Sequence, residues 1–138
     1  MTVRTISIKS VTTPGMGTLS FFEAKHDLDF AIKRIYYIHG VPAGTQRGGH
    51  AHKKLRQILF CPYGSITIKL DNGEETAEVL LDEPDKGLIV EHNMWRDMIW
   101  NQENSVLCVA ASEYYDPDDY IRDYDAFKAY VAAAEGEE

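Results

Sequence analysis

The sequence predicts an all-β domain that ends in a short α-helix. Nine or ten short runs rich in β-branched and aromatic residues follow one another, with turn residues between them. Strands that are short and regularly spaced are typical of a sandwich or a closed barrel. A single amphipathic pattern of helical period comes after them, near the C-terminus. With 138 residues, the chain is expected to form one domain over residues 1–138 with its own core.

The expected strands can be followed along the chain from residue 3. Residues 3–11 mix β-branched with polar residues, which predicts a strand at the edge of a sheet. A turn rich in proline and glycine follows at 13–17, and Asp71-Asn72-Gly73 marks a hairpin further on. The remaining strands are expected over 19–24, 30–38, 56–62, 65–70, 76–81, 87–90, 98–100 and 105–111.

The C-terminal helix is expected over residues 116–132. Asp116 suits the N-cap, Pro117 suits the first helical position, and the next two aspartates suit the positive end of a helix dipole. Apolar residues then recur at helical spacing, which predicts that the helix packs on the outside of the β domain. Residues 133–138 are expected to be a frayed tail.

Charge and composition exclude several classes of function. The formal net charge of −8 argues against non-specific nucleic-acid binding, which needs a basic field. No apolar run approaches the roughly 18 residues of a membrane span. Cys61 and Cys108 each lie inside an apolar run and are expected to be buried thiols. We therefore expect a cytoplasmic protein with neither a nucleic-acid nor a membrane partner.

The stretch from Gly44 to Gly64, GTQRGGHAHKKLRQILFCPYG, holds the most informative spacing in the chain. It sets His50 and His52 one residue apart, and side chains two apart on a strand share a face. Both imidazoles are therefore expected to point into one space. The spacing resembles the first motif of the cupin barrels, G-x5-H-x-H-x4-E-x6-G, with Gln57 at the glutamate position. This resemblance implies a single cupin β-barrel of the jelly-roll type.

The two histidines favour acid–base chemistry over metal binding. Two imidazoles and a neutral amide make a poor ligand set, so no metal and no other cofactor is expected. Imidazole titrates near neutrality, which makes His50 and His52 candidate general acids or bases. Arg47 stands just upstream, among glycines that let a ligand approach closely.

Aromatic and basic residues elsewhere extend this candidate site. Tyr36 and Tyr37 are neighbours on one expected strand, so at most one of the two can face the interior. An interior phenol could donate or relay a proton. Further along, Trp95 is a candidate stacking surface for the substrate, and Arg96 is a candidate contact for an anion.

Several stretches together resemble one particular family. They are RIYYI at 34–38, RGGHAHK at 47–53, GSITIKLDNG at 64–73, GLIV with a following WRDM within 87–98, and ASEYYDPDDYIRDYDAFKAY at 111–130. Over nearly the whole chain they resemble the dTDP-4-keto-6-deoxy-D-glucose 3,4-ketoisomerases. The resemblance implies a metal-independent isomerase that converts a dTDP-4-keto-6-deoxyhexose to the 3-keto sugar through an enediol.

The resemblance also implies roles for individual residues. His50 matches the catalytic base, Tyr36 matches its partner in proton shuttling, and His52 matches a second acid–base or orienting group. Arg47 is then expected to contact the developing oxyanion or the diphosphate. Lys53, at the end of the same motif, is expected to join in substrate binding.

The same resemblance implies a homodimer in which N-terminal strands are exchanged between subunits. Residues 1–11 are the candidate for that exchange, because an unpaired edge strand readily pairs with another chain. Other functions remain open on the residues alone. They are a cupin epimerase of nucleotide sugars, a nucleotide-sugar-binding cupin without turnover, and a metal-dependent cupin oxygenase.

Overall fold

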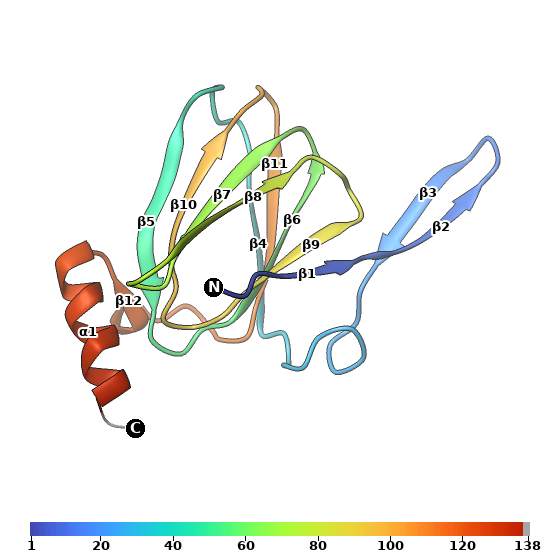
Figure 1. Ribbon diagram of the computed structural model, residues 1–138. Helices are drawn as coiled ribbons and strands as arrows, with labels where there is room; N and C mark the ends of the chain where they lie inside the picture. Colours follow the sequence, from blue (N-terminus) through green and yellow to red (C-terminus); the bar gives the residue numbers. More distant parts are fainter. Residues whose placement is uncertain (137–138) are drawn as a thin grey trace.

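Two antiparallel sheets face each other in the computed structural model, which describes residues 1–136 (Figure 1). The first has the order β1 (Arg4–Ser7), β9 (Lys86–Val90), β6 (Gln57–Tyr63), β11 (Val106–Ala111) and β4 (Arg34–Ile38). The second has the order β12 (Tyr120–Ile121), β5 (Gln46–His52), β10 (Trp95–Trp100), β7 (Ile66–Asp71) and β8 (Thr76–Leu81). A hairpin of β2 (Lys9–Thr13) and β3 (Gly17–Phe21) projects from this sandwich.

The predicted all-β class with one C-terminal helix is confirmed. Within the described residues the two sheets stay separate, so the sandwich is open where the sequence also allowed a closed barrel. Most of the expected strands recur with small shifts of their ends, but the predicted strand over 30–38 begins only at Arg34. Residues 22–33 instead form a loop that covers the outer face of the first sheet through Leu28 and Phe30.

The main core lies between the sheets because inward residues alternate along each strand. On β7 the buried residues are Ile66, Ile68 and Leu70, with less buried residues between them. Their counterparts from the first sheet include Leu59 on β6, in the same cluster of buried side chains. The same alternation decides which side chains of β5, β6 and β10 point into the space between the sheets at the polar end of the sandwich, which is described below.

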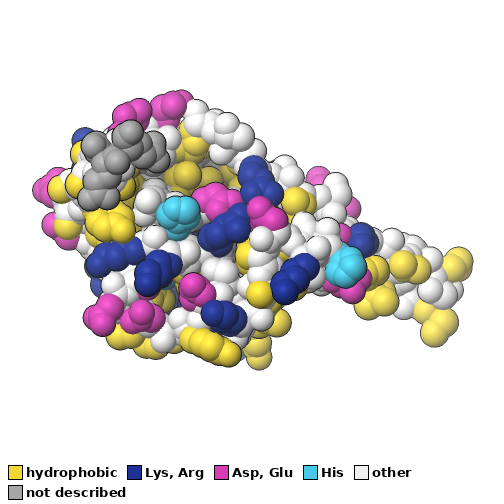
Figure 2. Space-filling model, turned by 90° about the horizontal axis from the view of Figure 1, so that it is seen from below, with side chains coloured by type: hydrophobic (Ala, Val, Ile, Leu, Met, Phe, Trp, Pro, Cys, Tyr) yellow, Lys and Arg dark blue, Asp and Glu magenta, His cyan; other side chains and the backbone are white. Residues whose placement is uncertain are grey.

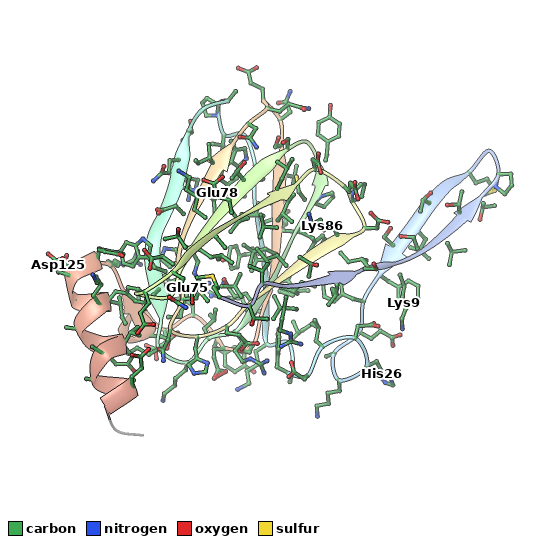
Figure 3. The ribbon with its side chains drawn as sticks, viewed as in Figure 1. Lys9, His26, Glu75, Glu78, Lys86 and Asp125 are labelled. Carbon is green, nitrogen blue, oxygen red and sulfur yellow. The ribbon has the colours of Figure 1, made fainter. Side chains whose placement is uncertain are left out.

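The N-terminal stretch predicted as one strand over 3–11 is two strands. β1 runs along β9 of its own chain at the edge of the first sheet. Ile8 is buried and ends that pairing, and β2 then leaves the sandwich to pair with β3. An ion pair between Lys9 and Asp27 ties the base of the hairpin to the loop that carries His26 (Figure 3).

The C-terminal helix begins eight residues later than the sequence predicted. Asp116 and Pro117 do act as cap and first residue, but of the single 3-10 turn η1 (Pro117–Asp119). The chain then extends as β12 beside β5, and α1 runs from Tyr124 to Gly136. Backbone pairing with β5 outweighs the local helical pattern here. The expected tail is therefore helical up to residue 136, and residues 137–138 lie outside the described part.

Helix α1 covers the outer face of the second sheet, as the sequence predicted. Its Phe127 and Val131 pack on Ala51 of β5, Ile121 of β12 and the half-buried Trp95 of β10. No helix in the described residues is long and apolar enough to cross a membrane.

Candidate active site

Polar side chains gather at one end of the sandwich, around a cavity of about 310 Å³. Strands β4, β5 and β10 line it together with the segment around β12. The polar residues of its wall are Arg34, Tyr36, Arg47, His50, Tyr115, Tyr120 and Arg122. The volume is at the lower end of ordinary ligand pockets, so a ligand as long as a nucleotide sugar must extend beyond it.

A bulge in β5 brings Arg47 to the same wall as the histidines. Along a regular strand Arg47 would face away from His50, because the two are three positions apart and side chains alternate between faces. The register between β5 and β10 shifts at this point, and Gly48 and Gly49 both have positive φ. A Cβ on Gly48 would lie 2.8 Å from the carbonyl oxygen of Arg96, so the bulge requires glycine. Beyond it, Arg47 stands opposite the inward-facing Met98.

The two histidines share one face of β5, as predicted, and differ in exposure. Their rings are perpendicular with centroids 5.1 Å apart. His50 is half-buried and lines the cavity, whereas His52 is fully buried behind it. Burial first, and then the positive charge of Arg96, lower the pKa of both imidazoles, that of His50 to about 4. Both rings are therefore neutral at physiological pH, and His50 can accept a proton.

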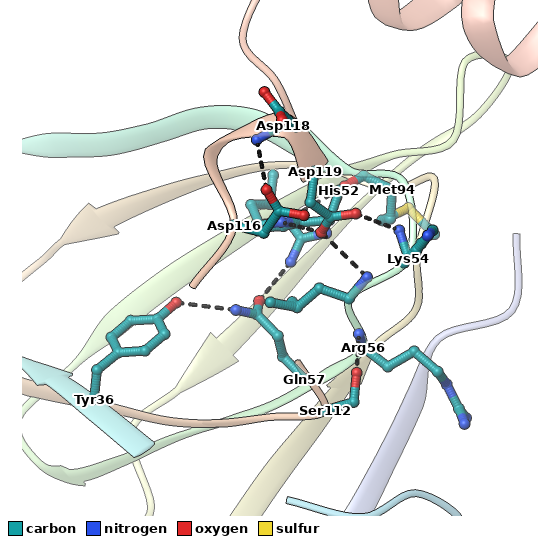
Figure 4. A network of polar contacts seen from close by, with 12 residues as sticks. Tyr36, His52, Lys54, Arg56, Gln57, Met94, Ser112, Asp116, Asp118 and Asp119 are labelled. Carbon is teal, nitrogen blue, oxygen red and sulfur yellow. Dashed lines mark hydrogen bonds and ion pairs between the residues drawn. The ribbon is translucent and has the colours of Figure 1, made fainter. Parts of the chain in front are cut away.

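Asp119 holds His52 in one orientation. Its carboxylate accepts hydrogen bonds from the backbone N–H groups of Lys54 (2.8 Å) and Leu55 (3.3 Å). His52 Nδ1 lies 3.1 Å from the same carboxylate and, as the neutral ring, donates to it (Figure 4). This bond leaves Nε2 of His52 as the unprotonated nitrogen. Nε2 is buried and has no hydrogen-bond partner among the described residues.

Tyr36 ends a second chain of hydrogen bonds, which starts at a buried arginine. Arg96 Nη1 donates to Gln57 Oε1 at 2.5 Å, and Gln57 Nε2 donates to the Tyr36 hydroxyl at 3.0 Å (Figure 4). Burial lowers the pKa of Arg96 to about 10, so it remains a cation. Burial raises the pKa of Tyr36, so its side chain is a phenol near neutral pH.

Three expected substrate contacts lie elsewhere. Trp95 points to the outer face of its sheet, because it alternates with the inward Arg96, and packs against α1. Lys53 is exposed over the ring of Tyr130 on the same helix. Arg96 is fully buried beneath the cavity, where it holds Gln57 and the carbonyl oxygen of Met94. None of the three therefore lines the cavity, and their expected roles, stacking by Trp95, an anion contact by Arg96 and substrate binding by Lys53, stay predictions.

Tyr36, Arg47 and His50 do meet at one cavity, but sequence reasoning missed part of its wall. Tyr120 pairs with His52 across the β5–β12 ladder and lies 4.4 Å from its ring. Arg122 lies over the ring of Tyr120, at 4.2 Å. The motif DDYIR carried the signal for these residues, but its helical pattern assigned them to packing. Asp119 was missed because it was assigned to the first turn of the expected helix.

The described residues contain no cluster of three or more His, Cys, Asp or Glu side chains that could hold a metal ion. The position where cupins usually carry a glutamate is occupied by Gln57, whose amide oxygen already accepts from Arg96. That oxygen is therefore turned toward a cationic side chain.

Comparisons with known proteins show the family of the chain. The family model FdtA (WxcM-like, C-terminal) matches residues 1–132. A TDP-4-oxo-6-deoxy-α-D-glucose 3,4-oxoisomerase from Aneurinibacillus thermoaerophilus is 45% identical over 116 residues, 84% of each chain. The structure of QdtA, a sugar 3,4-ketoisomerase from Thermoanaerobacterium thermosaccharolyticum in complex with TDP, superposes with a TM-score of 0.91. It is 41% identical, and the match covers 96% of both chains.

A second structure of that enzyme carries a His-to-Asn substitution and holds TDP-4-keto-6-deoxyglucose. It gives a TM-score of 0.90 at 40% identity, over 95% of this chain and 94% of that one. The fold and the cavity define an antiparallel sandwich with a polar pocket that holds a neutral imidazole and a phenol. The chain belongs to the FdtA-like family of sugar 3,4-ketoisomerases.

Proposed function

We propose that this protein converts a dTDP-linked 4-keto-6-deoxyhexose to its 3-keto isomer by proton transfer at the polar end of the sandwich. The observation that carries the proposal is the meeting of a neutral imidazole, a phenol and three arginines at one cavity. Isomerisation needs a base and an acid on one sugar, and a diphosphate needs cationic donors nearby. The matched relatives, which are named as 3,4-ketoisomerases, support it.

His50 is the base in this proposal. The hydrogen on C3 of the sugar is acidic because C3 lies next to the C4 carbonyl. His50 removes it, and the electron pair moves onto the carbonyl oxygen to give the enediol. O4 takes a proton to complete the enediol. C4 then receives a proton from His50, which has exchanged its proton with solvent, while O3 loses its own proton, so His50 is neutral again and the product is an isomer of the substrate. No oxidant or reductant is consumed.

The remaining site residues orient the reactants. Tyr36 supplies and recovers a proton at the sugar oxygens, while His52, held by Asp119 behind the cavity, orients the ring of His50. Arg47, with Arg34 and Arg122, provides donors for the diphosphate where the ligand leaves the cavity. In this assignment no metal and no other cofactor takes part.

We further propose that the protein is a homodimer and works in the cytoplasm. The projecting hairpin exposes apolar side chains, among them Leu19 at 66% and Met16 at 83% (Figure 2). A second copy of the chain would cover them, and β1 at a sheet edge is suited to exchange. Free thiols at Cys61 and Cys108 are typical of a reducing compartment. Sedimentation and cell fractionation check the two statements.

The test of the reaction follows the sugar carbonyl by ¹³C NMR, with dTDP-4-keto-6-deoxyglucose and purified protein. The proposal expects the carbonyl resonance to pass from C4 to C3. An epimerase would leave it at C4 and invert a neighbouring carbon, and a binding protein would leave the sugar unchanged. Either result contradicts the proposed function.

A further inference from the structure

The hydrogen bond between Gln57 and Tyr36 has a direction that its surroundings fix. A guanidinium can only donate, so the atom of Gln57 that faces Arg96 must be the amide oxygen. The amide nitrogen is thereby turned to Tyr36 and donates to its hydroxyl oxygen at 3.0 Å. Gln57 and Arg96 are both fully buried, so water does not compete for these groups.

The consequence concerns the proton of Tyr36. A phenol oxygen that accepts a hydrogen bond from Gln57 keeps its own O–H free to point elsewhere. Tyr36 lines the cavity, and its O–H is therefore available to a ligand there. A glutamate at position 57 would reverse this arrangement. A carboxylate only accepts, so it would draw the phenol proton inward and away from the cavity.

We propose that Gln57, oriented by Arg96, is a positioning residue that makes Tyr36 the proton donor of the site. This inference rests on the proposed isomerase function. As His50 removes the proton from C3, negative charge develops on O4, and the phenol gives its proton to O4. The phenolate that results is stabilised by the Gln57 N–H. C4 then takes up a proton from His50, which has exchanged its proton with solvent, and the phenolate recovers a proton from O3 as the C3 carbonyl forms. The phenol thus ends each turnover as it began.

Gln57→Glu and Gln57→Met separate this role from a merely structural one. Glu keeps a partner for Arg96 but reverses the bond to Tyr36, so kcat should fall by roughly 10²–10⁴-fold, as for loss of a general acid. Met is similar in size and cannot accept a hydrogen bond from Arg96, but it leaves the phenol proton free to face the cavity. We therefore expect a smaller loss of kcat. A structural role predicts the opposite order, because Met disturbs the buried arginine more than Glu does.

The Tyr36→Phe background provides the second readout. If Gln57 acts through the phenol, neither substitution at position 57 lowers kcat further once the hydroxyl is gone. The measurement is kcat and KM for wild type, both single variants, Tyr36→Phe and the two double variants, with melting temperatures to confirm folding. The loss is expected in kcat, with KM nearly unchanged.

The possible results separate the inference from the function on which it rests. The inference is supported if kcat decreases from wild type to Gln57→Met to Gln57→Glu and neither substitution lowers kcat further in the Tyr36→Phe background. Turnover by Gln57→Glu near the wild-type rate, or full additivity with Tyr36→Phe, overturns it and leaves the isomerase intact. If Gln57→Glu does not fold, the same additivity test with Gln57→Met decides. An inactive wild type would overturn the proposed function and this inference with it.

Discussion

The two ends of the sandwich are built by the same strands but hold different contents. On β6 the inward residues are Gln57 at the polar end and then Leu59 in the apolar core. On β10 they are Arg96 at the polar end and then Met98. At one end the side chains fill space with apolar groups, while at the other they hold one another through hydrogen bonds (Figure 4). Strand alternation therefore decides which residues point inward, and their chemistry decides whether the space becomes core or site.

The polar end also leaves groups unsatisfied in a way that the apolar end does not. His52 Nε2 is buried without a partner among residues 1–136, and Arg96 carries a charge that no carboxylate contacts directly. Each such group costs folding free energy. The apolar end has the opposite character, because its buried side chains present only favourable packing. We therefore expect substitutions at the two ends to separate turnover from stability.

His50→Asn should have the largest effect. Asparagine is polar but cannot take up a proton near neutral pH. The turnover rate should therefore fall by at least the factor that a general base contributes, roughly 10²–10⁴. Substrate affinity should change little, because the base acts mainly in the transition state. Product formation by NMR and binding by calorimetry measure the two quantities. Turnover at the wild-type rate would remove His50 from the role of base.

Ile68→Ala tests the apolar end. Ile68 is fully buried on β7, so its truncation should lower the free energy of unfolding by about 2–5 kcal/mol. The turnover of the folded protein should be unchanged. Leu80→Ala, on the exposed side of the neighbouring β8, is the control and should change stability by no more than about 0.5 kcal/mol. Urea unfolding measures both variants, and equal losses would contradict the assignment of the core.

Asp119→Asn should show a smaller loss of stability together with a loss of turnover. Asparagine keeps one acceptor but loses the charge that binds two backbone N–H groups and His52, which costs about 1–3 kcal/mol. The ring of His52 is then free to turn, so kcat should fall as well. Asp118→Asn, an exposed neighbour, is the matched control. If Asp119→Asn lost stability with unchanged kcat, the carboxylate would have no part in positioning His52.

The effect of pH should be the mildest of the four near neutrality. His50 must be neutral to act as the base, and its pKa lies near 4, so the acid limb of kcat/KM should fall well below pH 6.5. The free energy of unfolding should also decrease as the pH is lowered. Below pH 6.5 the histidines take up protons in the unfolded chain but stay neutral in the folded protein. Their contribution to stability is therefore fully present above pH 6.5 and is lost progressively toward pH 4. Rate profiles and melting curves check this, and an acid limb near 6.5 would contradict it.

The sequence predicted the parts of the site that depend on strand parity. The shared face of His50 and His52 follows from their spacing, and the inward position of one tyrosine follows from the Tyr36–Tyr37 pair. Parity failed for Arg47, where the bulge at Gly48 and Gly49 changes the face. The pair of glycines was the visible sign of that bulge. Its position depends on the partner strand β10, which a single sequence does not reveal.

The sequence was wrong where tertiary pairing replaced a local preference. Residues 116–132 have a good helix start and helical spacing, yet Tyr120 and Ile121 extend beside β5. Trp95 was placed in the site on its residue type alone, but strand alternation turns it to the helix side. Gln57 was recognised as a departure from the cupin pattern. Its link to Tyr36 and Arg96 required three strands to be placed together in space.

The most direct test of the central claim is the position of deuterium after reaction in deuterated water. The protein is incubated with dTDP-4-keto-6-deoxyglucose, and the product is examined by NMR. If the polar end of the sandwich removes the C3 proton and a proton is added at C4, deuterium appears at C4 of a 3-keto sugar. Deuterium at C3 or C5 of a sugar that keeps its 4-keto group would contradict the account.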